Sequence, residues 1–165
     1  MTKAKRLCAW AAAGAASLVA LAALAGPRFT RSEPVPGEPV VEDAVTGLVW
    51  QGCSAGQIGA DCQTGSAVTF TWQEALVYCD GLSWGGESDW DLPGAKELRS
   101  IVDNKVYNPA IDEAVFPQTE SSCHWSSSVN ANSTSGAWGV YFNYGRVNYY
   151  DKDDTVHVRC VRRGP

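Results

Sequence analysis

The sequence predicts an α+β domain in which two short helices precede a small antiparallel sheet. Two observations carry this prediction. Apolar residues recur at helical spacing twice between residues 71 and 103, and from Cys123 onward their period changes to two. Glycine-rich and polar segments separate these stretches, so long loops are expected as well.

The composition bounds the function. A chain of 165 residues is long enough for one domain with its own core and too short for a large multidomain enzyme. Its content of 45% hydrophobic and 19% charged residues is typical of a folded chain. A formal net charge of -5 argues against nucleic acid as a partner, because non-specific nucleic-acid binding needs a basic face.

The N-terminus is typical of an export signal, which we place at residues 1–25. A basic start is followed by an uncharged run from Leu7 to Ala25 that ends in small residues, and cleavage is expected before Gly26. An uncleaved anchor is the alternative, because a run of this length can just span a bilayer. The protein is therefore expected to be exported: periplasmic, on the cell surface or secreted.

Residues 26–41 contain four prolines and scattered charges. This composition predicts an extended spacer. The folded domain is then expected over residues 42–165.

Two helices are expected next. The first begins at the capping box Thr-Trp-Gln-Glu of residues 71–74, in which the hydroxyl and the carboxylate each satisfy a free amide of the helix start. Its buried face carries Cys79, and Gly81 ends it. The second helix begins after Gly94 and keeps helical spacing of apolar residues to Val102.

The strands are predicted from alternation. Residues 46–50 indicate a turn that leads into a short strand, and residues 138–150 indicate a hairpin that turns at Asn143–Arg146. Residues 156–160 alternate with Cys160 on the buried face. Arg159 and Arg162 are therefore expected to point outward, either into solvent or toward acidic residues across the sheet.

The six cysteines indicate an oxidising compartment. Cys8 lies in the predicted signal, which leaves five. A bridge between Cys53 and Cys62 would stiffen a glycine-rich loop, and one between Cys79 and Cys160 would tie the first helix to the last strand.

Cys123 then has no partner. It is either a reactive or intermolecular thiol, or a buried and inert one. No cofactor and no metal are expected, because the sequence has no C-x-x-C pair and only two histidines, His124 and His157. The acidic segment 151–154 matches no EF-hand spacing and is expected to be a solvated loop.

A series of motifs in order resembles the Lcl C-terminal domain family over Asp43 to Arg163. The motifs are Thr46-Gly47-Leu48-Val49-Trp50-Gln51, Thr71-Trp72-Gln73-Glu74-Ala75-Leu76, Trp90-Asp91-Leu92-Pro93 with Lys96-Glu97-Leu98, Trp125-Ser126-Ser127-Ser128, Ala137-Trp138 and Val158-Arg159-Cys160-Val161-Arg162. The tryptophans among them are expected to lie in the core. The sequence departs from the family pattern at Gly94 and at Cys123.

The resemblance implies a C-type-lectin-like fold, with both termini in one sheet and recognition on a long loop region. In such folds a helix cysteine is commonly bridged to the final strand, which supports Cys79 with Cys160. Some relatives are adhesins that bind sulfated glycosaminoglycans. Without the basic residues of the predicted signal, this chain has 10 basic against 18 acidic residues, which disfavours a polyanion.

A candidate binding surface lies in the C-terminal third of the sequence. Tyrosine offers contact area at low entropy cost, and Asn and Asp add adaptable hydrogen bonds. The alternative is a polar hairpin whose exposed face needs only solubility. The candidate residues are Asn130, Asn132, Tyr141, Asn143, Tyr144, Arg146, Asn148, Tyr149, Tyr150, Asp151 and Asp153.

The sequence therefore favours a secreted or envelope-associated, adhesin-like module without catalytic activity that binds an extracellular glycan or protein. One alternative is a cysteine-dependent enzyme related to sulfatase-activating oxidases, with Cys123 and His124 as nucleophile and base. Adjacent strand residues point to opposite faces, which places this pair poorly for proton transfer. The other alternative is a purely structural envelope protein.

Overall fold

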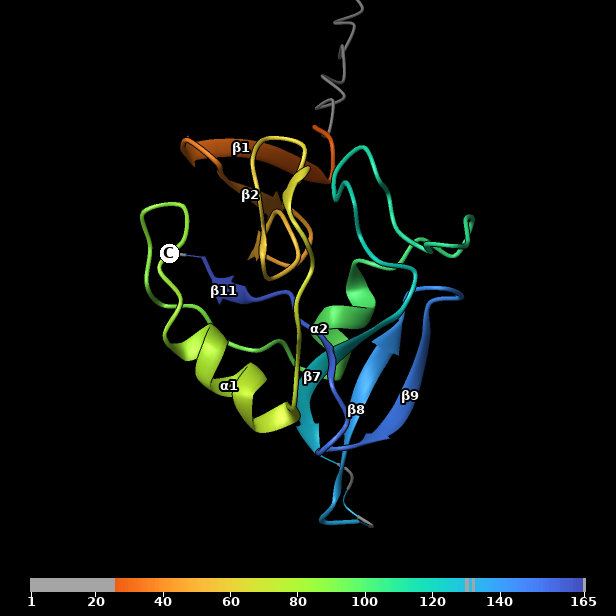
Figure 1. The fold of residues 1–165 in the computed structure, drawn as a ribbon. Helices are drawn as coiled ribbons and strands as arrows, with labels where there is room; N and C mark the ends of the chain where they lie inside the picture. The colour runs from red at the N-terminus through yellow and green to blue at the C-terminus, as the bar shows by residue number, and fades with distance from the viewer. Residues whose placement is uncertain (1–25, 130, 132, 165) are drawn as a thin grey trace, which may run out of the picture.

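The computed structural model describes residues 26–129, 131 and 133–164, and the chain there is α+β, with two short helices among small sheets (Figure 1). The predicted signal at residues 1–25 lies outside the described residues. The helices are α1 (Trp72–Asp80) and α2 (Ala95–Ser100). The strands are β1 (Phe29–Val35), β2 (Glu38–Asp43), β3 (Leu48–Gln51), β4 (Gln57–Ile58), β5 (Thr64–Gly65), β6 (Thr69–Phe70), β7 (Cys123–Val129), β8 (Gly136–Tyr141), β9 (Arg146–Asp151), β10 (Val156–His157) and β11 (Val161–Arg163).

The first sheet joins the two ends of the part of the chain that the structure describes. Its order is β1-β2-β3-β11, and each neighbouring pair is antiparallel. The prediction of an extended spacer over residues 26–41 is wrong, because β1 and most of β2 occupy this segment. Pro36 and Gly37 form the turn between the two strands, and Pro34 lies near a bulge of the edge strand, where a missing N–H is tolerated.

An ion pair fixes the start of this hairpin. The Arg28 guanidinium donates to both carboxylate oxygens of Asp43, at 3.0 and 2.7 Å, and to the Ser100 carbonyl oxygen. Asp43 is buried, and it also accepts hydrogen bonds from Thr46 and from the amide of Val45. Although burial opposes it, the bond with Arg28 and the other hydrogen bonds hold the pKa of Asp43 below 3.8.

The second sheet has the order β6-β10-β7-β8-β9 and carries the predicted hairpin. The hairpin is confirmed: β8 and β9 pair antiparallel without interruption, from Tyr141 with Arg146 to Gly136 with Asp151. Gly145, in the turn, has a φ of 66° that favours glycine. The prediction of an antiparallel sheet is wrong for one pair of strands, because β10 lies parallel to β7.

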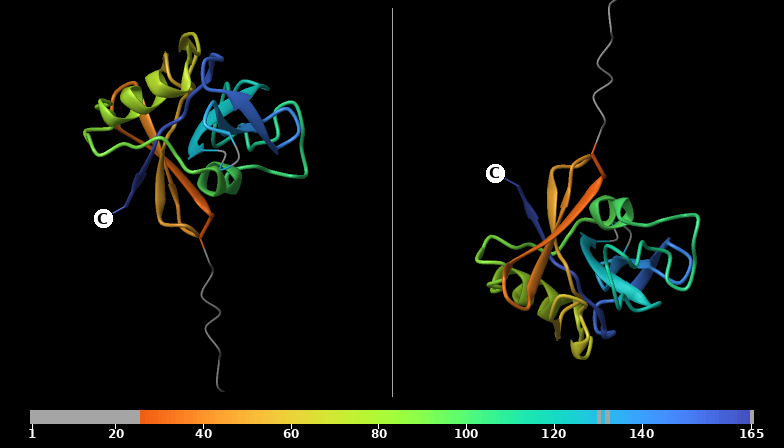
Figure 2. Two further views of the ribbon diagram at one scale, coloured as in Figure 1. Left: turned by 90° about the horizontal axis from the view of Figure 1, so that it is seen from below. Right: turned by 90° about the horizontal axis from the view of Figure 1, so that it is seen from above.

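The helices start as their sequences predict. At α1 the capping box is confirmed, with the Thr71 hydroxyl accepting from the Glu74 amide and the Glu74 carboxylate accepting from the Thr71 amide. At α2 the Glu97 carboxylate accepts from the amide of Gly94 at 2.7 Å. This helix is only six residues long, and it packs against β7, β8 and β9. Figure 2 shows the two sheets side by side with α2 close to both.

The core has two parts. One contains both disulfides together with Trp84, Trp90 and Trp125, and the other forms between the first sheet and α2 around Trp50 and Phe116. Of the tryptophans expected in the core, Trp50, Trp90 and Trp125 are at most 1% exposed, whereas Trp72 and Trp138 are half-buried.

Both expected disulfides are present. Cys53 is bonded to Cys62, and Cys79 to Cys160. Cys123 is free and buried. Two disulfides indicate an oxidising environment. Across the described ranges, the structure contains no helix long and apolar enough to cross a membrane.

Candidate functional site

Part of the predicted surface gathers on one face of the β7–β8–β9 sheet. Cys123, Tyr141 and Arg146 form one row across the three strands. Because side chains alternate along a strand, Asn148 and Tyr150 lie on the same face of β9 as Arg146. Both Arg146 and Asn148 are exposed, whereas Tyr141 and Tyr150 are half-buried. We call the face formed by these five side chains the hairpin face.

A hollow of about 510 Å³ opens on the hairpin face between β9 and β10. Tyr141 and Tyr150 line one side of it, and Thr69 of β6 lines the other. Thr69 reaches this place because β6 pairs with β10, with Thr69 opposite His157. The residues that line the hollow are Thr69, Ser122, Cys123, Tyr141, Tyr150, Asp154, Thr155, Val156 and His157.

Tyr150 is held in place from two directions. Its ring packs edge-on against Trp125 with the ring centroids 6.0 Å apart. Burial and the hydrogen bond with Cys123 raise the pKa of the Tyr150 hydroxyl to about 12. At neutral pH the hydroxyl is therefore protonated, so it can both donate and accept a hydrogen bond.

The Cys123 thiol lies at the floor of this hollow and is 5% exposed. Burial raises its pKa to about 12, and the hydrogen bonds with Tyr150 and with the His124 backbone, which lower the pKa, are smaller effects. Since the thiolate is the nucleophilic form of cysteine, a raised pKa lowers the fraction of the reactive form at neutral pH. The Cβ of an alanine at Gly139 would lie 2.6 Å from the Cys123 sulfur, so glycine is required for this close approach.

The turn of the hairpin adds aromatic surface. Tyr144 is 61% exposed, its ring lies 6.3 Å from that of Tyr141, and the Arg146 guanidinium lies 6.0 Å from the Tyr144 ring. The side chain of Asn143, in contrast, is engaged in hydrogen bonds within the protein. Its amide donates to Asn108 at 3.0 Å and to Ser121 at 3.1 Å, so it fixes the turn to the preceding loop.

The remaining predicted residues lie elsewhere. Tyr149 belongs to the opposite face of β9, where its ring packs against Trp138 with a centroid distance of 6.2 Å and its hydroxyl contacts Ser133. The predicted set is therefore divided between two faces, because consecutive strand residues point in opposite directions. Asn130 and Asn132 are outside the described residues.

Residues 151–154, the acidic segment at the end of β9, form hydrogen bonds with one another. Asp151 accepts from the Asp153 amide at 3.3 Å, and Asp154 accepts from the Asp151 amide at 3.2 Å. Both Asp151 and Asp153 are exposed. Among the residues with described positions, no group of three or more His, Cys, Asp or Glu is arranged to hold a metal ion.

Arg159 is fully buried, so the prediction that it points outward is wrong. Strand geometry ends after His157, and the period-two alternation does not continue. The Arg159 guanidinium donates to the Gln51 carbonyl oxygen, to Ser54 and to Thr119, at 2.9, 3.3 and 2.8 Å. Burial lowers its pKa to about 9, which still leaves it charged at pH 7.

His124 lies beside this buried arginine, on the opposite side of β7 from Cys123. Its Nε2 is 3.4 Å from the Ser54 hydroxyl and 3.8 Å from a Glu120 carboxylate oxygen. Burial and the charge of Arg159 lower the pKa of His124 well below 6.5. The imidazole is therefore neutral at pH 7, and its contact with Glu120 is not an ion pair.

Arg162, in contrast, fits the prediction of an outward residue paired with acids. Its guanidinium donates to Asp89 at 2.6 and 3.2 Å and lies 3.5 Å from Glu87.

Comparison with protein families matches residues 39–162 to the Lcl C-terminal domain. The chain belongs to this family. The match begins inside β2 and ends inside β11, so it contains both helices and at least part of every strand except β1. None of the curated proteins compared with the chain matches it.

Two parts of this Lcl C-terminal domain were not expected from its sequence. Thr69 and His157 line the hollow only because β6 and β10 pair across most of the chain, and no local pattern signals this pairing. The cluster of Arg159 with Ser54 likewise depends on contacts between residues 105 positions apart. The only sequence signal for this cluster was the position of Arg159 among the apolar residues Val158, Cys160 and Val161.

Proposed function

We propose that this Lcl C-terminal domain is a non-catalytic, adhesin-like module that binds an extracellular glycan or protein through the hairpin face and its hollow. The observation that carries the proposal is the hollow, which two half-buried tyrosines line on a strand face that also presents exposed Arg146 and Asn148. Tyrosines held by packing lose little entropy on binding, and the neighbouring amide and guanidinium supply directional hydrogen bonds.

The proposal includes a C-type-lectin-like fold and an exported location: periplasmic, cell-surface or secreted. The first sheet, which joins both ends of the described part of the chain, and the bridge from α1 to residue 160 support this fold assignment. The two disulfides support export. Nucleic acid is not proposed as a partner, because the chain is acidic.

The proposal of no catalysis rests on Cys123. A pKa of about 12 keeps the thiol protonated, and the imidazole of His124 lies on the other face of the strand. The other four cysteines in the described part of the chain are bridged. Titration of the native protein with a thiol reagent at pH 7 is expected to leave Cys123 unmodified until the protein is unfolded. Rapid modification of the native protein would favour the cysteine-dependent enzyme instead.

The binding proposal is tested by screening the purified protein on glycan and extracellular-protein arrays. The variants Tyr141→Ala and Asn148→Ala are expected to weaken binding of any captured ligand at least tenfold. Tyr149→Ala is the matched control, because it removes a tyrosine from the opposite face of β9, the strand that carries Asn148, and it should retain binding. Captured ligands that lose affinity only with Tyr149→Ala would overturn the proposal. Failure to capture any ligand, with protein found only as a structural component of the envelope, would favour the structural alternative.

A further inference from the structure

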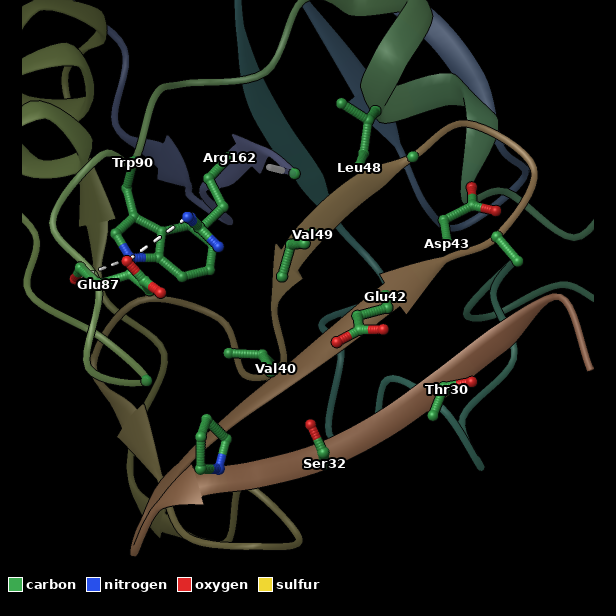
Figure 3. Close-up of a pocket in the computed structure, with 15 residues that line it drawn as sticks. Thr30, Ser32, Val40, Glu42, Asp43, Leu48, Val49, Glu87, Trp90 and Arg162 are labelled. Atoms are coloured by element: carbon green, nitrogen blue, oxygen red, sulfur yellow. Dashed lines mark hydrogen bonds and ion pairs between the residues drawn. The ribbon is translucent and has the colours of Figure 1, made fainter.

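A second hollow lies on the other sheet, away from the hairpin face. It has a volume of about 520 Å³ and opens over the outer face of the β1-β2-β3-β11 sheet. Figure 3 shows Trp90, Glu87 and Arg162 on one side of it, Glu42 over the middle strands, and Thr30 and Ser32 on the edge strand. We call this hollow the sheet groove.

The floor of the sheet groove follows from the strand register. Thr30 pairs with Glu42, Glu42 with Val49, and Val49 with Arg162, so these four side chains form one row across the sheet. Val41, Trp50 and Val161, which neighbour this row along β2, β3 and β11, point into the core. The floor therefore combines the apolar side chains of Val40 and Val49 with hydroxyls on β1 and charged groups at its centre and side.

The charge of the sheet groove is negative. The one guanidinium that lines it, that of Arg162, is already occupied by Asp89 at 2.6 Å and by Glu87 at 3.5 Å. Its side chain is only 15% exposed. The Glu42 carboxylate is exposed, and no hydrogen bond or ion pair with another described residue engages it. Asp43 also lines the groove, but Arg28 pairs with it. The carboxylates of Glu42 and Glu87 in the groove and of Asp89 beside it therefore stand against the single guanidinium of Arg162, which leaves an excess of two negative charges.

We propose that the sheet groove binds a cationic, extended peptide segment of a partner protein. The ammonium of a lysine would meet Glu42, and its methylene stem would lie over Val40 and Val49, since long basic side chains bury their stems on apolar surface. Thr30 and Ser32 offer hydroxyls to the peptide backbone. An anionic ligand is disfavoured by the same charges.

The sheet groove and the hairpin face belong to different sheets, so the two sites are independent. β1 and β2 of the groove and β8 and β9 of the hairpin face lie at different ends of the molecule in Figure 1. A ligand on one site therefore leaves the other open. This inference does not rest on the function proposed for the hairpin face.

The test uses a fluorescein-labelled hexapeptide, Ser-Lys-Val-Lys-Val-Ser, and the same peptide with both lysines replaced by glutamine. Fluorescence anisotropy is expected to show binding of the lysine peptide only. Glu42→Gln should weaken it at least fivefold, whereas Glu113→Gln, which removes an exposed carboxylate outside the groove, should change the affinity less than twofold. Ser32→Lys should weaken it more than tenfold, because the new ammonium competes for Glu42.

Amide shifts in an NMR titration locate the peptide, with the largest changes expected at Thr30, Ser32 and Val49. Equal weakening by Glu42→Gln and Glu113→Gln would mean general attraction to an acidic protein and would overturn the proposal. Equal binding of the glutamine peptide, loss of binding in Tyr141→Ala or no binding at all would overturn it as well. Dimerisation of the protein through this face, detected by sedimentation and abolished by Ser32→Lys, would replace the peptide with a second copy of the chain.

Discussion

The free energy of unfolding should fall as the pH is lowered from 7 to 5, chiefly because of His124. This side chain is fully buried, and burial together with the charge of Arg159 lowers its pKa well below 6.5. In the unfolded chain the pKa of a histidine is near 6.5. Below that pH the unfolded state binds a proton that the folded state does not bind, so acid favours unfolding.

The size of this loss follows from the one proton that His124 binds in the unfolded state and not in the folded state. Once the pH is well below 6.5, the loss is about 1.4 kcal/mol per pH unit, and integration from pH 7 to pH 5 gives an upper limit of about 2 kcal/mol for His124, reached when the folded side chain stays neutral over this range. His157, whose pKa burial also lowers, adds a loss of the same sign. Asp43, with its pKa held below 3.8, loses its stabilising effect only in more acidic solution.

Urea unfolding followed by tryptophan fluorescence at pH 7, 6 and 5 measures this loss. His124→Gln should remove most of it, whereas His157→Gln, the only other histidine variant that the chain allows, should keep at least half of it. The C2 proton of His124 in the native protein should show no NMR titration between pH 7 and pH 5. An unchanged pH dependence in His124→Gln, together with titration of that proton near pH 6.5, would refute the reasoning.

Two further predictions concern covalent and steric constraints. Replacing Cys79 and Cys160 by serine should lower the free energy of unfolding by about 4.5 kcal/mol, and replacing Cys53 and Cys62 should lower it by about 2.7 kcal/mol. The difference arises because the two bridges close loops with sequence separations of 81 and 9. Equal losses of unfolding free energy in urea would contradict this. Gly139→Ala should lower the free energy of unfolding by about 1 to 3 kcal/mol, since the new Cβ would lie 2.6 Å from the Cys123 sulfur. An unchanged melting temperature in calorimetry would contradict this and would show that the strands can separate there.

The elements that could be predicted from the sequence are those that local chemistry determines. The capping box at Thr71 and the β8–β9 hairpin each depend on residues close together in the chain. The bridge from Cys79 to Cys160 was predictable because both cysteines lie on buried faces and because the family resemblance implied it.

The errors have long-range causes. Residues 29–41 have a spacer composition, yet they form strands because β3 and the core behind Val41 supply pairing and burial that no local pattern shows. The outward placement of Arg159 failed because the strand ends after His157. Within the candidate site, alternation along β9 could have separated Tyr149 from Tyr150, whereas the contribution of Thr69 depends on pairing between distant strands.

The central claim is that the hairpin face binds a ligand, and the most direct measurement is an NMR titration of the isotope-labelled protein with a ligand captured on the arrays. The account predicts that the largest amide shifts occur at Thr69, Tyr141, Asn148 and Tyr150, with the first sheet unchanged. Shifts centred on Trp138 and the opposite face of β9 would contradict it.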